Sequence, residues 1–344
     1  MITFFDKDYL RSCVDTFNNN TDSQICLTEK NTGKLFPYIR YGKLHYNSHF
    51  ETFLLLHNLA VIPHAQIGDL PSLFHDVYTL IDYNYYSVAS HMLENLENQI
   101  SIFLNNDLNT IIKKTDIDLC SQITTSIYHE FGHLYLPQNI KIYKNLTEFA
   151  KRELTDIIRF CKKRKYHPIG FISRGRTKMA KEMMDNERIL EELACDLWGV
   201  WASFCYLKNN YDNNQYIQRI LFQSIHAINL KILFDFSTAD TKRWIKDWKK
   251  NVLFYSGTLN RYNVSASYCI ELSDDDMDDK QTLNFYYRSL KNTILYNLKK
   301  ANNIAHQLIS QGASSQLNIS QKKILMDRLT AIEIKLVNRL RTLN

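Results

Sequence analysis

The sequence has little glycine and little proline, with nine and five residues respectively among 344. Turn-rich all-β folds, collagen-like chains and low-complexity chains need more of both residues, so the composition argues against these classes. Aromatic residues make up 12% of the chain, which excludes a disordered protein because disordered segments contain few of them. The composition therefore predicts a folded globular protein.

Long hydrophobic runs and a disulfide pattern are also missing. The most apolar stretch, residues 53–62, includes His57 and Asn58 and is far shorter than the roughly 20 residues that a spanning helix needs. The N-terminal residues lack the basic-then-apolar order of a secretion signal. The seven cysteines are scattered and form no CxxC pair, so neither a disulfide framework nor a thiolate zinc site is predicted. We expect a cytoplasmic protein without a membrane segment.

The net charge of +6 is unevenly distributed along the chain. Residues 151–178 contain ten Lys or Arg against two acidic residues, and residues 280–344 contain eleven against two. Five aspartates lie in one run at 274–279. Such asymmetry can indicate a nucleic-acid or acidic-protein partner, or simply solvated faces. We favour solvated faces over nucleic-acid binding, because neither basic stretch contains a nucleic-acid-binding motif.

The hydrophobic pattern predicts an α+β protein that is mainly helical. Short strands are expected within 33–48, where aromatic and β-branched residues alternate with glycine and proline. Helical periodicity is expected over 116–135, 177–207, 284–309 and 320–343, with Ser320 as the N-cap of the last helix. We divide the chain into an N-terminal mixed α/β region (1–100), a catalytic core (101–235) and a helical C-terminal region (236–344).

The motif that carries chemistry is His129-Glu130-Phe131-Gly132-His133. Side chains four residues apart share one face of a helix, so the two imidazoles can hold one metal ion. Glu130 can then take a proton from a water molecule at that metal. Zinc suits this arrangement because imidazole nitrogen is a good ligand for it. Chance placement of His and Glu gives only about 0.013 such motifs in a chain of this composition.

A catalytic zinc of this class needs a third protein ligand, and the sequence EELACD at 191–196 offers one. Glu192 is our candidate for that ligand. Asp196 lies four residues later, on the same helical face, and could accept a hydrogen bond from His129 or His133 to fix the orientation of that ring. The alternative is that these acids form a solvated helix face.

HEFGH followed by EELACD resembles the gluzincin branch of the zincin metallopeptidases, whose pattern is HExxH with a downstream ExxxD. The resemblance covers about 80 residues, 119–201. Among bacterial proteins, the sequence is similar to the Lit and ImmA peptidases of phage exclusion and mobile-element control. It implies a zincin-like core in which His129, His133 and Glu192 bind Zn²⁺. It also implies that Glu130 is the general base and that Asp196 supports a ligand histidine.

The expected function is therefore cleavage of a peptide bond in a protein or peptide substrate, in a defence or toxin-like setting with an activating partner. His226 is our first candidate for stabilising the oxyanion, with Tyr206 or Tyr211 as alternatives. The basic run at 162–165 could grip an acidic substrate, because it lies between the two expected ligand helices, or it could be a solvated loop. Two other functions stay open: a non-catalytic binding protein stabilised by metal, and a nucleic-acid-associated protein using residues 280–344.

Overall fold

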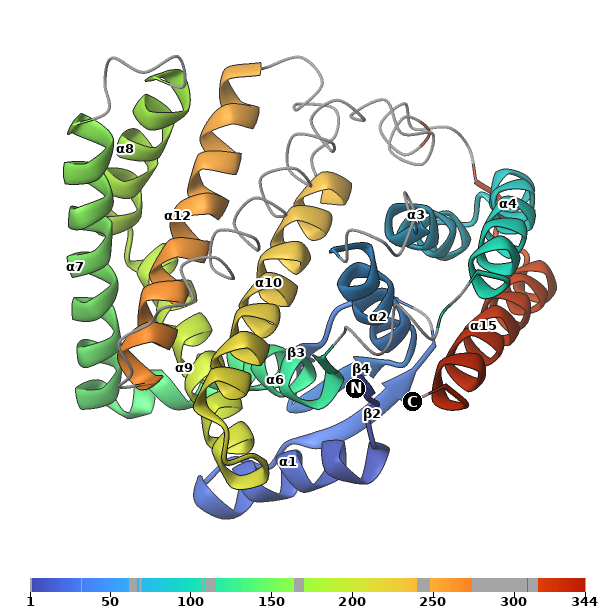
Figure 1. Ribbon diagram of the computed structural model, residues 1–344, viewed down its shortest axis with the longest axis horizontal. Helices are drawn as coiled ribbons and strands as arrows, with labels where there is room; N and C mark the ends of the chain where they lie inside the picture. The colour runs from blue at the N-terminus through green and yellow to red at the C-terminus, as the bar shows by residue number, and fades with distance from the viewer. Residues whose placement is uncertain are drawn as a thin grey trace. The chain divides into compact units, whose positions relative to one another are not determined.

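A computed structural model describes most of the chain (Figure 1). The described residues are 2–31, 33–61, 67, 70–106, 108, 116–163, 170–239, 248–273, 308 and 315–343. They form a mainly helical α+β protein with short strands, as predicted. Within these residues, no helix combines the length and the apolar character that crossing a membrane would require. The helix expected over 284–309 lies outside the described residues except for position 308.

Contacts between Cα atoms divide the chain into two compact units, each of them discontinuous in sequence. Unit 1 consists of Met1–Arg11, Ile25–Cys120 and Asn302–Asn344, and unit 2 of Ser12–Gln24 and Ser121–Ala301. The helices α1 (Lys7–Asn20) and α6 (Leu119–Tyr135) contribute residues to both. The units thus interleave along the chain, whereas the division from the sequence used consecutive ranges.

All strands among the described residues lie in unit 1. β4 (Lys43–Asn47) pairs in parallel with β2 (Cys26–Lys30) and antiparallel with β3 (Tyr38–Arg40). The strands expected within 33–48 are thus present, and Tyr41 and Gly42 reverse the chain between them with φ values of 52° and 68°. A second, two-stranded sheet pairs β1 with β5 in parallel. The remaining elements of unit 1 are β1 (Ile2–Thr3), β5 (Ile117–Asp118), α2 (His49–Val61), α3 (Leu70–Asp82), α4 (Tyr86–Leu104) and α15 (Ile319–Arg341).

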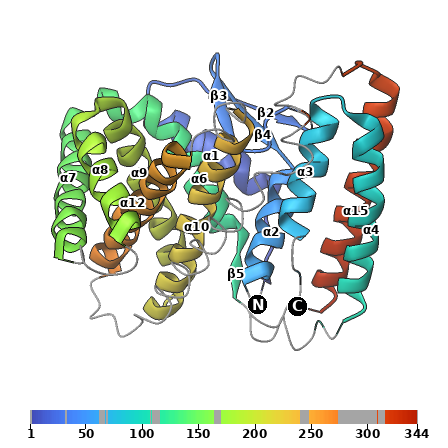
Figure 2. The same cartoon turned by 90° about the horizontal axis from the view of Figure 1, so that it is seen from above.

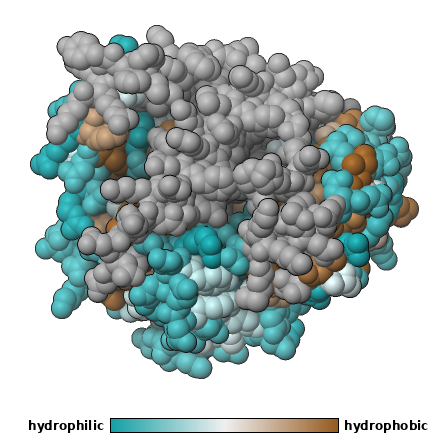
Figure 3. All heavy atoms as spheres, in the orientation of Figure 1, coloured by the Kyte–Doolittle hydropathy of each residue, from teal (hydrophilic) through white to brown (hydrophobic). Residues whose placement is uncertain are grey.

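The last helix of unit 1 begins earlier than its sequence suggested. The side chain of Asn318, not Ser320, caps α15 by accepting a hydrogen bond from the backbone N–H of Gln321. Apolar side chains stay exposed on the helices α4 and α15, among them Ile102 and Ile324. Figure 3 shows brown apolar patches over these two helices, whereas the described surface over α7 (Ile140–Lys163) is largely hydrophilic.

The regular secondary structure in the described part of unit 2 is entirely helical. Its helices α7 and α8 lie side by side, and α12 packs against both α8 and α9 (Figures 1 and 2). The predicted end of the helix that carries His129 and His133 is confirmed, because α6 ends at Tyr135 and Pro137 lies in the 3-10 turn that follows. The helices after α6 are α7 (Ile140–Lys163), α8 (Gly170–Asp185), α9 (Glu187–Asn210), α10 (Asn214–Ala239) and α12 (Trp248–Ser273).

The single helix expected over 177–207 is in fact two helices. Asn186 separates α8 from α9, and its side-chain oxygen accepts hydrogen bonds from the backbone N–H groups of Arg188 and Ile189 at 3.1 and 3.3 Å. An asparagine N-cap satisfies donors that have no partner within the helix. This cap marks the start of α9.

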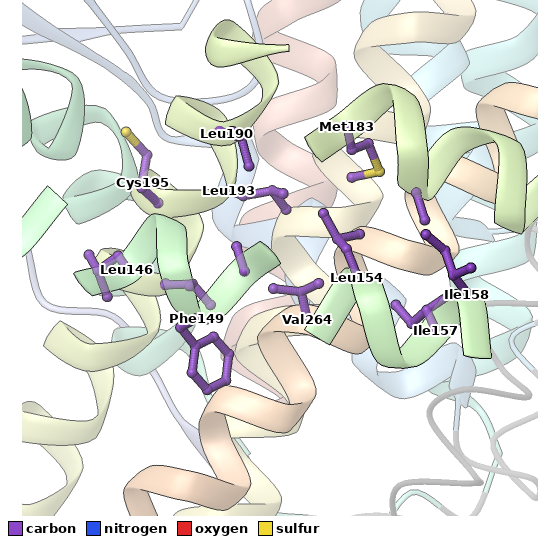
Figure 4. Packing of buried hydrophobic residues seen from close by; sticks show 14 of the residues in the cluster. Leu146, Phe149, Leu154, Ile157, Ile158, Met183, Leu190, Leu193, Cys195 and Val264 are labelled. Carbon is purple, nitrogen blue, oxygen red and sulfur yellow. The ribbon is translucent and has the colours of Figure 1, made fainter. Parts of the chain in front are cut away.

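A hydrophobic core holds α9 against its neighbours (Figure 4). Burying one leucine side chain stabilises the fold by about 1.5–3 kcal/mol relative to leaving it exposed. Because one face of α9 is fixed in this core, the face that carries Glu192 and Asp196 is fixed too. The core includes Leu146, Phe149, Leu154 and Ile157 of α7, Met183 of α8, Leu190, Leu193 and Cys195 of α9, and Val264 of α12.

Candidate metal centre

The helix α6 presents His129 and His133 on one face, as their spacing predicted. Their ring centroids lie 5.1 Å apart, and the planes are nearly perpendicular. His129 is buried, whereas the His133 side chain is 30% exposed. His129 is therefore held in the protein interior, whereas His133 is accessible to solvent.

Two glycines allow α9 to cross α6 at close range. A Cβ atom added to Gly199 would overlap the carbonyl oxygen of Thr125 and lie 3.2 Å from the backbone nitrogen of His129. A Cβ atom on Gly132 would lie 3.1 Å from the Sγ atom of Cys195. Backbones can approach this closely only where side chains are missing. The crossing brings the acidic residues of α9 over the histidines of α6.

Glu192 lies between the two imidazoles at this crossing. Its Oε2 atom is 3.6 Å from His129 Nε2, and its Oε1 atom is 3.7 Å from His133 Nε2. One ligand atom from each of the three residues lies within 4.8 Å of the other two. Ligand atoms of a tetrahedral zinc ion, bound at 2.0–2.2 Å, are separated by about 3.4 Å, so small side-chain movements suffice to enclose the ion. Within the described residues, no other group of His, Cys, Asp and Glu is arranged in this way.

The other ring nitrogen of each histidine faces a carboxylate. His129 Nδ1 lies 2.9 Å from Asp196 Oδ1, and His133 Nδ1 lies 3.1 Å from Glu191 Oε1. A carboxylate behind a ligand histidine fixes the orientation and tautomer of the ring. The sequence left open which histidine Asp196 would support, and the structure places it at His129. It also adds Glu191, which precedes Glu192 in the EE pair and had no role in the sequence analysis.

Arg261 of α12 completes the site and was missed by sequence reasoning. Its Nη2 atom donates to Asp196 Oδ1 at 2.8 Å and to Glu192 Oε2 at 3.3 Å, and its Nε atom donates to Asp196 Oδ2. Arg261 is separated from Asp196 by 65 residues. Its neighbours in sequence form no recognisable motif, so only the packing of α12 on α9 reveals its role.

Asp196 is charged although it is almost completely buried. Burial alone would raise the pKa of this carboxyl group, but Arg261 and His129 outweigh that effect and lower it to about 2. Burial alone would likewise lower the pKa of Arg261, and Asp196 and Glu192 raise it instead. An unpaired buried charge would be costly, so each of these groups depends on the others.

The other expected site residues do not belong to the triad formed by His129, His133 and Glu192. Glu130 follows His129 on α6 and is partly exposed. The backbone of His226 belongs to α10, but its side chain lies outside the part of the chain that is described. Tyr206 lies 14 residues beyond Glu192 on the same helix, about 21 Å along its axis, and Tyr211 lies farther still. Neither tyrosine can reach a metal held by Glu192.

No protein-family model matches this chain, and no curated protein and no solved structure matches it either. The gluzincin resemblance therefore stays a prediction from two short motifs.

Proposed function

We propose that the protein is a zinc-dependent metallopeptidase. The observation that carries this proposal is the convergence of His129 Nε2, His133 Nε2 and the Glu192 carboxylate, with one ligand atom from each lying within 4.8 Å of the others. Two imidazoles and one carboxylate form a ligand set typical of catalytic zinc, which keeps a position open for water or substrate.

The surroundings of the triad also favour a catalytic site over a closed structural one. Structural zinc sites usually have four protein ligands, most of them cysteine thiolates. Cys195 is the cysteine nearest in sequence to Glu192, and burial together with the charges of Asp196 and Glu192 raises the pKa of its thiol far above neutrality. The side chains of His133 and Glu192 are 30% and 35% exposed, so a substrate can approach from this side.

Each residue of the site has a separate role in the proposed reaction. Zinc bound at the triad would polarise the scissile carbonyl group and lower the pKa of an attacking water to about 7. The Glu130 carboxylate would accept a proton from the attacking water and pass it to the nitrogen of the leaving amine as the peptide C–N bond breaks. Asp196 and Glu191 keep the two imidazoles oriented, and Arg261 keeps Asp196 ionised.

The compartment and the biological setting belong to the same proposal. All seven cysteines are free thiols, which suits the reducing cytoplasm. The resemblance to the Lit and ImmA peptidases supports a defence or toxin-like role, with narrow specificity and an activating partner.

The test compares cleavage by the zinc-loaded wild type with cleavage by Glu130→Gln, using a denatured bacterial proteome as substrate and mass spectrometry of new amino termini. We expect new termini with the wild type and a loss of at least about a hundredfold with Glu130→Gln, in line with the contribution of a general base. Glu148→Gln, a change at an exposed position of α7, is the matched control and should cleave normally. Zinc-loaded wild type that produces no new termini would contradict a peptidase that acts without its activating partner, and Glu130→Gln with full activity would contradict the proposed mechanism.

A further inference from the structure

A basic pocket lies between α7 and α8, in the segment that connects the two metal-bearing helices. Its volume is about 330 Å³. Four cationic side chains and two hydroxyl groups contribute to its lining, namely Lys162, Arg174, Lys178, Lys181, Ser173 and Thr177. Beneath them, the thiol of Cys161 is buried. We call this feature the α7–α8 pocket.

No carboxylate lines the α7–α8 pocket among the described residues. The nearby Glu182 pairs with Lys178 at 3.7 Å, but both side chains are at least half exposed, and an exposed pair of this kind is weak. Four cations gathered around one small cavity repel one another. A bound anion relieves that repulsion, so the pocket has the electrostatic character of an anion site.

The pocket has a fixed position relative to the metal triad within unit 2. Asn260 of α12 joins α8 through two hydrogen bonds: Arg176 Nε donates to its Oδ1 atom at 2.9 Å, and its Nδ2 atom donates to the Arg176 carbonyl at 2.8 Å. Both residues are buried. The next residue of α12, Arg261, binds Asp196 and Glu192. One turn of α12 therefore holds the pocket helix and the metal helix together.

The distance from the pocket to the triad is short enough for one extended peptide to reach both. α8 ends at Asp185 and α9 begins at Glu187. The helical rise and the length of the linking residues therefore limit the Cα separation of Lys178 and Glu192 to at most about 25 Å. An extended chain covers this span with about eight residues.

We propose that the α7–α8 pocket binds an acidic segment of the polypeptide substrate, an inference that rests on the proposed peptidase function. The lysines of the pocket and the hydroxyl group of Ser173 bind the carboxylate side chains, whereas the Thr177 hydroxyl donates its hydrogen bond to the Ser173 carbonyl at 2.9 Å. Among the residues that the structure describes, its lining contains no aromatic side chain on which a nucleic-acid base could stack, which favours a polypeptide over a single-stranded nucleic acid. The acidic segment then lies within about eight residues of the bond that is cleaved.

The binding test titrates a fluorescein-labelled octa-aspartate peptide with the full chain and follows fluorescence anisotropy. Lys178→Gln/Lys181→Gln removes two pocket cations, and Lys144→Gln/Lys151→Gln removes the same charge from exposed positions of α7 outside the pocket. We expect binding about tenfold weaker in the pocket variant and nearly unchanged in the control, as loss of two exposed ion pairs implies. Equal losses in the two variants would overturn the inference, as would tighter binding of duplex DNA or of inorganic pyrophosphate than of the peptide.

Two further measurements separate this inference from the proposed function. His133→Ala should bind the octa-aspartate peptide as the wild type does, because the pocket contains no metal ligand, and a matching loss would contradict a separate site. In the proteome digest, new amino termini should lie within about eight residues of acidic segments. The pocket variant should keep its zinc-dependent cleavage but lose that preference. Cleavage by the wild type without acidic enrichment would overturn the substrate assignment and leave the peptidase proposal intact.

Discussion

Arg261 and Asp196 form a two-pronged ion pair, in which the guanidinium group donates one hydrogen bond to each carboxylate oxygen. The pair joins α12 to α9 next to Glu192, to which Arg261 also donates a hydrogen bond. Asp196 Oδ1 is also 2.9 Å from His129 Nδ1, so the same carboxylate links Arg261 to a candidate metal ligand. Folding of unit 2 and the geometry of the site are therefore tied to one buried contact.

Replacing Arg261 with methionine should destabilise the protein strongly. The substitution keeps much of the side-chain volume but leaves Asp196 buried without its main counter-charge, a loss that typically costs about 3–5 kcal/mol. Urea denaturation at pH 7 measures this effect. The double variant Arg261→Met/Asp196→Leu should recover much of the lost stability, since no charge is then left unpaired. A stable single variant would contradict the account of this ion pair.

The two glycines at the α6–α9 crossing should differ in their tolerance to alanine. Gly199→Ala drives a methyl group into the Thr125 carbonyl, and overpacking against backbone costs about 1–3 kcal/mol or more. The new methyl group of Gly132→Ala would lie 3.1 Å from the Sγ atom of Cys195, so we expect a smaller loss of stability. The higher helix propensity of alanine offsets that loss by up to about 1 kcal/mol. Thermal unfolding should rank the wild type and Gly132→Ala above Gly199→Ala. The reverse order of the two variants would contradict the crossing geometry.

Glu51 of unit 1 should make stability depend on pH. Burial raises the pKa of this carboxyl group from 4.5 to about 7, although the hydroxyl of Tyr46 donates a hydrogen bond to it at 3.0 Å. The folded state therefore holds the proton more tightly than the unfolded state. Its stabilising effect is fully present below about pH 4.5 and is lost as the pH rises to about 7, for a total of up to about 3 kcal/mol.

Glu51→Gln keeps the shape of the side chain and an acceptor for Tyr46 but cannot ionise. The variant should be more stable than the wild type at pH 8 by up to about 3 kcal/mol, with the difference shrinking toward pH 4.5. Chemical denaturation at several pH values measures it, with the exposed Glu94→Gln of α4 as the control. A difference that does not change between pH 4.5 and 8 would contradict the raised pKa.

The sequence predicted the parts of the site that depend on helical spacing. His129 and His133 share a face of α6, and Glu192 and Asp196 share a face of α9, because side chains four residues apart point the same way in any α-helix. The strands within 33–48 followed from residue type and turn residues.

Contacts between distant segments were not predictable in this way. Arg261 reaches Asp196 across 65 residues, and no local pattern distinguishes it from other arginines of an exposed helix face. The break between α8 and α9 was detectable in principle, because Asn186 is a favoured N-cap residue, but the apolar periodicity continues across it. The contact between Glu191 and His133 depends on how α6 and α9 cross, and the sequence of neither helix alone determines that crossing.

The central claim is that His129, His133 and Glu192 hold one metal ion, and metal content by mass spectrometry tests it most directly. Wild type purified without chelator and supplied with zinc should contain about one zinc per chain, as a three-ligand site predicts. His133→Ala and Glu192→Gln should lose it. Glu191→Gln, which changes only the group behind His133, should keep the metal with an affinity about 10–100-fold lower. Wild type that binds no zinc under these conditions, or Glu192→Gln that binds it as the wild type does, would contradict the claim.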